Sequence, residues 1–192
     1  MIFTPTRIPD VHLVDIARRQ DTRGHFARLF CTEAFAAHGL ATHFPQISMS
    51  FNATRGTMRG LHFQYPPTTE AKYVRCLHGE IFDVVVDLRP ESPTYLEHVG
   101  VHLSAENGRG LYVPERFAHG FMTLRDDTEV LYLISAAHMP GLEGGLPHDD
   151  PALAIEWPGP VSVMSERDSL WQPVAQVGAE IAVRLSLRET VA

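Results

Sequence analysis

Arg59 and His62 stand three residues apart in residues 59–64, which read Arg-Gly-Leu-His-Phe-Gln. Histidine titrates near neutral pH and can act as a general base, while arginine offers a planar pair of donors that suits phosphate. Turn-forming residues flank this segment on both sides, and we predict a short strand here. Later segments each bring one more polar side chain that a buried site could use, namely Lys72, Asp83, His119, Tyr132 and Asp168.

The chain contains 11 histidines, a number that suggests a metal site. Metal-binding β-barrels usually present two ligands from one strand as His-x-His, which projects both imidazoles to one side. Neither His-x-His nor His-Glu-x-x-His occurs in the sequence. Convergence of His62, His78 and His119 in space stays open as an alternative, but we expect no metal and no cofactor.

Other common catalytic motifs are missing from the sequence as well. The Gly-x-Ser-x-Gly turn of many serine hydrolases, the phosphate-binding loop and the glycine fingerprint of dinucleotide binding do not occur. Among the reactions considered, acid–base chemistry by His62 with a second proton donor therefore remains. The residue pattern alone supports only an all-β domain with a ligand cavity.

Composition and charge limit the partners. The 192 residues carry a net charge of -7 and 44% hydrophobic residues, as expected for a globular protein without a basic nucleic-acid surface. No apolar run approaches the roughly 18 residues of a membrane span, and the N-terminus lacks a signal peptide. We expect a cytoplasmic protein that binds neither nucleic acid nor membrane. Its 16 basic residues are 15 arginines and a single lysine, Lys72.

Short β-type segments recur about every 10 residues, with Gly, Pro, Asn or Asp between them, which predicts an all-β sandwich or barrel. Residues 44–64 are predicted as two strands joined by a turn at 52–56. The first of these strands alternates polar with apolar residues, so we expect one polar and one apolar face. Residues 80–88 are apolar on both faces and predict a central strand, in which Asp83 would be a buried carboxylate that needs a partner.

The relative orientation of Arg59 and His62 depends on the regularity of their strand. In a regular strand the two side chains would point to opposite faces, because side chains alternate. Both can serve one site only if a bulge near Gly60 interrupts the alternation.

A helix is predicted at residues 32–39, with Thr32 as its cap. Phe35 and Ala36 are expected to face the core, and the glycine at the end of the segment can terminate the helix. Residues 25–30, just before the helix, are predicted as a strand.

We predict one domain over residues 1–192, with a barrel core at about 44–158 and a C-terminal tail at about 165–192. Ser165 is expected to cap a helix at the start of the tail. Residues 179–187 are predicted as a terminal helix or strand.

Several motifs together resemble the dTDP-4-dehydrorhamnose 3,5-epimerase family, beginning with Arg-Gly-Leu-His-Phe-Gln at residues 59–64. Residues 79–89, 103–107, 113–121, 149–151 and 155–158 match further family motifs in the same order and with similar spacing. The resemblance implies a jelly-roll (cupin) barrel with short flanking helices, a homodimer and no metal. It also implies that the substrate is dTDP-4-dehydro-6-deoxy-glucose.

The resemblance further implies proton transfer at C3 and C5 of the sugar, the two carbons that flank the C4 ketone. His62 would be the base, Asp168 its dyad partner and Tyr132 the acid on the opposite face. Lys72 would stabilise the enolate oxygen at O4. The substrate-binding residues implied are Arg23, Arg28, Gln46, Arg59, His119, His138, Glu143 and Arg167, of which Arg23 and Arg59 suit the diphosphate.

Three departures from the family pattern lie near nucleotide or sugar contacts. His138 ends a segment in which the family often has an aromatic residue that stacks on the thymine base, and His138 could stack instead. Arg28 stands where a carboxylate is common, and residues 144–148 replace another typical segment. Two alternatives therefore stay open. One is a mono-epimerase or isomerase of another nucleotide 4-keto-deoxysugar, and the other is a non-catalytic cupin that binds sugar nucleotides.

Overall fold

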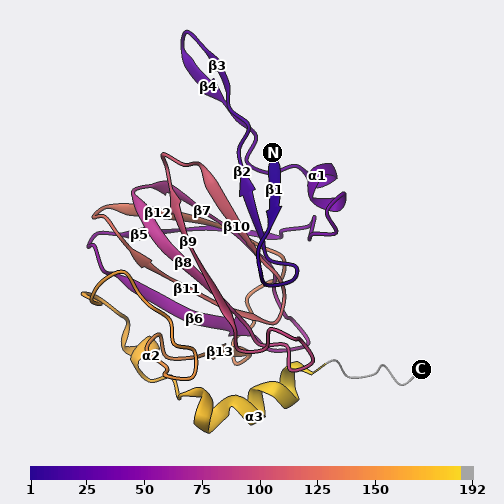
Figure 1. Ribbon diagram of the computed structural model, residues 1–192, viewed down its shortest axis with the longest axis vertical. Helices are drawn as coiled ribbons and strands as arrows, with labels where there is room; N and C mark the ends of the chain where they lie inside the picture. Colours follow the sequence, from indigo (N-terminus) through magenta and orange to yellow (C-terminus); the bar gives the residue numbers. More distant parts are fainter. Residues whose placement is uncertain (187–192) are drawn as a thin grey trace.

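Two antiparallel β-sheets face each other in the computed structural model, which describes residues 1–186 (Figure 1). The six-stranded sheet has the order β1 (Ile2–Pro5), β2 (His12–Asp15), β10 (Arg109–Val113), β7 (Lys72–His78), β12 (Thr128–Ile134) and β5 (Gln46–Asn52). The five-stranded sheet has the order β13 (Glu143–Gly145), β6 (Met58–Gln64), β11 (Phe117–Thr123), β8 (Glu80–Asp87) and β9 (His98–Ser104). The prediction of an all-β jelly-roll is confirmed, although the two sheets are not hydrogen-bonded into a closed barrel.

The remaining elements are a hairpin and three helices. The hairpin consists of β3 (Arg19–Asp21) and β4 (Gly24–Phe26), and it projects away from the body of the molecule (Figure 1). The helices are α1 (Thr32–Ala36), α2 (Glu166–Ser169) and α3 (Val174–Leu185). None of the helices in residues 1–186 is long and apolar enough to span a membrane.

Three apolar clusters follow from the alternation of the strands. The first lies between the sheets and includes Val74, Val85 and Phe121. The second packs α3 onto the outer face of the five-stranded sheet, and the third packs α1 onto the outer face of the six-stranded sheet. Strand β8 contributes Val85 to the first cluster and Val84 to the second, so the prediction that it is buried on both faces is confirmed.

The two faces of β5 meet different surroundings. Its polar residues turn toward the space between the sheets, where Ser48 and Ser50 line a cavity. Its apolar residues lie on the outside, where Ile47, Met49 and Phe51 are 66%, 57% and 53% exposed. The predicted division into a polar and an apolar face is therefore confirmed, with the apolar face turned outward.

A bulge at Gly60 gives Arg59 and His62 a common direction. On β11 the partner of His62 is His119, and the partner of Arg59 is Phe121, so β6 carries one residue more than β11 between these pairs. Gly60 has a φ of 120°, which side chains rarely adopt. Both Arg59 and His62 consequently line one cavity, and the bulge that a shared site requires is present.

Several predicted boundaries were wrong. Helix α1 ends at Ala36, which is exposed, and its N-cap is Cys31, not Thr32. The strand predicted at 25–30 ends at Phe26, because residues 27–30 lie beyond the hairpin and pair with no strand. The predicted cap Ser165 is confirmed, since its Oγ accepts a hydrogen bond from the Asp168 amide at 3.1 Å.

The terminal element predicted at residues 179–187 is a helix, and it begins earlier than expected. Helix α3 starts at Val174, and residue 187 lies outside the described residues. Strands β1 and β2 extend the six-stranded sheet with residues that precede the predicted core at 44–158.

We expect Gly60→Ala to lower the free energy of unfolding by at least about 2 kcal/mol, because a Cβ here adds backbone strain to a steric clash. The new atom would lie 2.5 Å from the Gly120 Cα and 2.7 Å from the His119 carbonyl oxygen, neither of which can rotate away. Urea unfolding measures the change. Gly159→Ala is the matched control, because a Cβ there meets nothing within 4 Å. Equal effects of the two substitutions would contradict the role given to the bulge.

Candidate active site

A cavity of about 350 Å³ lies between the two sheets and collects most of the predicted site residues. Its walls come from β5, β6, β7, β11, β12 and β13, with Arg167 of α2 at one side. The predicted residues that line it are Gln46, Arg59, His62, Lys72, His119, Tyr132, His138, Glu143 and Arg167. Asp168 is buried next to the cavity, whereas Arg23 and Arg28 are not among the lining residues.

The carboxylate of Asp168 fixes the imidazole of His62. The His62 Nε2 lies 2.6 Å from the Asp168 Oδ1, and the Gly60 amide donates to the Asp168 Oδ2 at 3.3 Å. A carboxylate only accepts hydrogen bonds, so Nε2 carries the proton and Nδ1 keeps a free lone pair. Burial raises the pKa of Asp168, but the hydrogen bond and charge of His62 outweigh this and hold the pKa below its usual value. The arrangement can orient His62 as a base and support its charged form.

Trp171 lies beside this dyad and was not recognised in the sequence. Its ring meets that of His62 edge-on at 6.3 Å between centroids, and the guanidinium of Arg167 lies 5.4 Å from the indole centroid. A Cβ at Gly145 would come within 2.2 Å of the indole, so the glycine makes room for it. Apart from its closeness to Asp168 in the chain, no sequence signal marks Trp171, because its place depends on tertiary packing.

Tyr132 reaches the cavity from the opposite sheet. It lies on β12, whereas His62 lies on β6. Its hydroxyl lies 3.1 Å from the Ser50 Oγ. Burial raises the pKa of the Tyr132 phenol well above its usual value of 10.0. The phenol is thus protonated at neutral pH and can donate a proton from the wall that faces His62.

Lys72 stands next to a carboxylate that the sequence analysis missed. Its Nζ lies 3.0 Å from the Glu70 Oε1, and both residues line the cavity. Residues two positions apart share a face of an extended segment, so the spacing of Glu70 and Lys72 is compatible with their contact. The spacing alone did not show that the extended segment begins as early as Glu70.

His119 also has a buried carboxylate partner. Its Nε2 lies 2.7 Å from the Asp83 Oδ1, and both side chains are almost completely buried. The prediction that Asp83 is buried and needs a partner is therefore confirmed. The pair presents His119 to the cavity from β11 in a fixed orientation.

Arg59 differs from Lys72 because the side chain that holds it is neutral. Its Nε donates to the Asn52 Oδ1 at 2.7 Å. No ion pair within residues 1–186 involves Arg59. Its positive charge is therefore available to an anionic ligand.

A polar network forms the rim of the cavity. The His138 Nε2 lies 3.2 Å from the Glu143 Oε1, and the Arg167 Nη2 lies 3.8 Å from the same oxygen. Backbone amides, chiefly those of Glu143 itself and Gly141, lower the pKa of Glu143. The Gln46 Oε1 accepts a hydrogen bond from the His138 amide at 3.1 Å. The side chain of His138 thus contacts a carboxylate.

Arg23 and Arg28 lie in or near the projecting hairpin. Arg23 occupies the turn between β3 and β4, its side chain is 87% exposed, and it pairs with Asp21 at 2.6 Å. Arg28 follows the hairpin, and its Nη1 lies 3.6 Å from the Cys31 Sγ. Within a single chain, therefore, the structure does not bring these two predicted substrate ligands to the cavity.

The structure gives no support to the metal alternative. Residues 1–186 contain no group of three or more His, Cys, Asp or Glu side chains placed to hold a metal ion. His62 and His119 line the cavity, but His78 lies elsewhere, with its Nδ1 2.7 Å from the Asp127 carbonyl oxygen. The three histidines considered in the sequence analysis thus do not converge.

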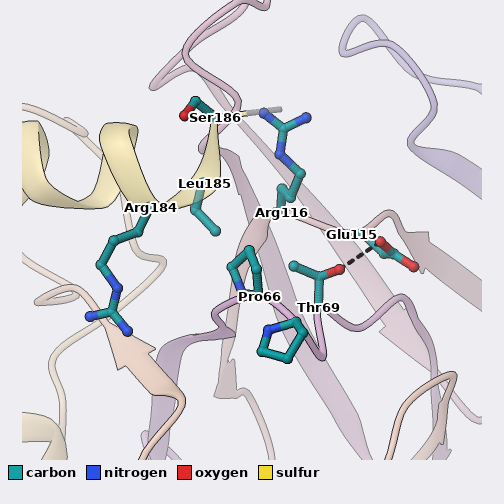
Figure 2. Close-up of a pocket in the computed structure, with 8 residues that line it drawn as sticks. Pro66, Thr69, Glu115, Arg116, Arg184, Leu185 and Ser186 are labelled. Carbon is teal, nitrogen blue, oxygen red and sulfur yellow. Dashed lines mark hydrogen bonds between the residues drawn. The ribbon is translucent and has the colours of Figure 1, made fainter. Parts of the chain in front are cut away.

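A second cavity of about 530 Å³ lies at the end of α3 (Figure 2). Its arginines are already paired, since Arg116 contacts Glu91 at 2.7 Å and Arg184 contacts Glu180 at 3.2 Å. Figure 2 shows the two guanidinium groups pointing away from each other. This larger cavity therefore lacks the converging reactive groups of the smaller one.

The fold and the cavity define a jelly-roll protein with a His–Asp pair and a buried tyrosine around one cavity, and comparison with known proteins narrows the class. The family model described as dTDP-4-dehydrorhamnose 3,5-epimerase matches residues 5–176. A dTDP-4-dehydrorhamnose 3,5-epimerase of Sinorhizobium fredii is 43% identical over 170 residues, which cover 88% of this chain and 87% of that protein. The chain belongs to the dTDP-4-dehydrorhamnose 3,5-epimerase family and is an enzyme of the isomerase class.

Two other relatives show the range of this similarity. The crystal structure of an epimerase from Legionella pneumophila in complex with dTDP-4-keto-L-rhamnose superimposes with a TM-score of 0.88 at 34% identity, covering 94% of this chain and 96% of that one. A dTDP-4-dehydrorhamnose 3-epimerase of Streptomyces niveus is 38% identical over 169 residues, covering 88% of this chain and 81% of that protein.

We expect Asp168→Asn to reduce the free energy of unfolding more at pH 5 than at pH 3. The folded-state pKa of Asp168 lies below its usual value of 3.8, so the carboxylate stabilises the folded protein above that value. This contribution is lost as the pH falls through the lower, folded-state pKa. Urea unfolding of both proteins at the two pH values measures it. Glu166→Gln, which changes an exposed carboxylate of the same helix, is the control. A destabilisation by Asp168→Asn that does not depend on pH would contradict this expectation.

Proposed function

We propose that this enzyme epimerises C3 and C5 of dTDP-4-dehydro-6-deoxy-glucose to give dTDP-4-dehydro-rhamnose. The observation that carries the proposal is the position of two proton-transfer groups on facing sheets, His62 on β6 and Tyr132 on β12, around one cavity. A sugar between them can lose a proton on one face and receive another on the opposite face. Such an exchange inverts the configuration of the carbon.

The chemistry follows from the ketone at C4. Hydrogens on C3 and C5 are acidic because the electron pair left behind can move into the carbonyl group. His62, supported by Asp168, takes the proton, and the negative charge develops on O4. The ammonium of Lys72 stabilises that charge. Tyr132 then protonates the carbon from the other side as the ketone forms again, and exchange with water restores the proton on Tyr132 and removes that on His62.

The nucleotide part of the substrate fits the rim of the cavity. Arg59, whose Nε donates to the neutral Asn52 side chain, suits the diphosphate, while Gln46, Glu143 and Arg167 surround the opening. His138 can stack on the thymine base if it leaves Glu143. His119, held by Asp83, is placed to contact the sugar. The proposal needs no metal ion, because Lys72 supplies the positive charge at O4.

A second candidate is a mono-epimerase that inverts a single carbon. The relative from Streptomyces niveus, a 3-epimerase by name, supports this candidate, because its similarity to the chain approaches that of the 3,5-epimerases. The two activities need the same base and acid, so they differ in how the sugar can turn between the two proton-transfer groups. A non-catalytic sugar-nucleotide-binding cupin is the third alternative, and the intact dyad and phenol weigh against it.

The proposed active form is a homodimer in which each hairpin reaches the cavity of the other copy. Two observations support it. The hairpin extends beyond the body of its own chain (Figure 1), and its tip carries the exposed Arg23. The edge strand β5 presents the outward apolar residues Ile47, Met49 and Phe51, whose burial against a second copy would be favourable. This arrangement would give Arg23 the diphosphate contact that a single chain does not allow.

We expect the purified protein, incubated with the substrate in D2O and a chelator, to introduce deuterium at both C3 and C5. Deuterium enters the sugar because the proton that Tyr132 donates, like the one that His62 removes, exchanges with the solvent. NMR of the sugar reads each carbon separately. Label at one carbon only would favour the mono-epimerase. Absence of label with substrate bound would refute the proposed reaction. His62→Ala is expected to abolish exchange at both carbons, and exchange that persists in this variant would overturn the assignment of the base.

We expect Arg23→Ala and His62→Ala to complement each other when the two variants are co-expressed. In a random mixture about one quarter of all cavities would combine an intact His62 with a partner hairpin that carries an intact Arg23, because half of the dimers are mixed and each has one complete site. Activity is measured at a substrate concentration at which each variant alone is nearly inactive. Failure to recover activity, with mixed dimers demonstrated by differential tags, would show that the hairpin does not contribute Arg23 to the partner's cavity.

A further inference from the structure

The carboxylate of Glu70 and the ammonium of Lys72 form an ion pair inside the cavity. The Glu70 Oε1 lies 3.0 Å from the Lys72 Nζ, and the side chains are only 14% and 11% exposed. The backbone between them is fixed, because the Ala71 amide donates to the Ser135 Oγ at 2.8 Å and the Ser135 amide donates to the Ala71 carbonyl at 3.0 Å. This pairing continues the β7–β12 ladder beyond Lys72. Alternate side chains of such an extended segment share a face, so both enter the cavity.

The other carboxylates around the cavity are engaged elsewhere. Asp168 holds His62 at 2.6 Å, and Asp83 holds His119 at 2.7 Å. Glu143 contacts His138 at 3.2 Å and Arg167 at 3.8 Å on the rim. In the part of the chain that the structure describes, Glu70 is therefore the carboxylate that compensates the charge of Lys72.

We propose that Glu70 is a positioning residue, which keeps the ammonium of Lys72 charged and directed into the cavity. This inference rests on the proposed function, because it assumes that Lys72 stabilises the oxygen of an enolate. Removing an ammonium from water costs free energy that a nearby carboxylate offsets. Without such a partner, an almost buried lysine loses its proton more easily and turns toward water.

The ion pair leaves Lys72 able to act on a substrate. An ammonium group has three donors, so Lys72 can donate to a ligand while its Nζ stays 3.0 Å from the Glu70 Oε1. The direction of the Cε–Nζ bond is then set before the substrate arrives, and less reorganisation is needed as charge develops on the oxygen. Glu70 itself is not required to contact the reacting atoms.

Lys72 can be observed directly because it is the only lysine in the chain. Lysine labelled with 13C and 15N in the side chain gives a single Lys72 signal, whose pH titration can be followed without substrate. We expect Glu70→Gln to move the midpoint of this titration downward by about one pH unit or more, because the neutral amide no longer favours the charged form. Glu180→Gln removes a carboxylate from the ion pair with Arg184 on the outside of α3, and it is the matched control that leaves the midpoint in place.

Steady-state kinetics provides the second readout. Glu70→Gln is expected to lower kcat roughly tenfold or more, because the developing negative charge loses part of its stabilisation, while KM changes much less. Glu70→Asp retains the charge and is expected to recover part of both the rate and the titration midpoint. Thermal unfolding checks that each variant is folded.

An unchanged Lys72 midpoint in folded Glu70→Gln would overturn the inference, as would a kcat equal to that of the parent protein. If the parent protein exchanges the hydrogen at neither C3 nor C5, the proposed reaction is refuted. The Lys72 titration still tests the charge-holding role of Glu70 in that case, so the two failures are distinguishable.

Discussion

Charge buried between two apolar sheets is the constraint on which this site depends. An isolated ion in such a space would neutralise or turn outward, so a buried charged group needs a partner. Asp168 contacts His62, Asp83 contacts His119 and Glu70 contacts Lys72. These pairs restrict the cavity side chains to defined directions. A ligand thus meets preorganised groups, which would lower the reorganisation needed during the proton transfer that we propose.

The jelly-roll provides the two walls that such chemistry requires. Each sheet is stabilised by apolar packing between the sheets and on its outer face, so both walls are rigid. His62 projects from one wall and Tyr132 from the other. The bulge at Gly60 is essential to this geometry, since Arg59 would otherwise face away from the space that His62 enters. The reaction that we propose inverts a carbon and so needs access to both of its faces, which a site between two sheets allows.

Two features of the surface have no counterpart within a single chain. The apolar face of β5 is exposed although the opposite face of the same strand lines the cavity. The hairpin carries Arg23 away from the cavity that His62 and Tyr132 line. Both features are reconciled by the homodimer that we propose, because one contact between copies would cover the apolar strand and return the arginine to a substrate. The cavity of a single copy would then be one part of the active unit.

The sequence by itself determined the β-rich architecture, the two-faced β5 and the buried β8, because alternation is a local property. Residue chemistry singled out His62, Lys72 and Tyr132, whereas Gln46, His138, Glu143 and Arg167 were assigned to the site through the resemblance to the family. It also showed that Arg59 and His62 could share a site only through a bulge. The end of α1, the place of Trp171 and the pairing of Lys72 with Glu70 were decided by tertiary packing. His62 and Asp168 lie 106 positions apart, and only the approach of α2 to β6 brings them within 2.6 Å. Such long-range pairings depend on register and packing, which no local pattern encodes.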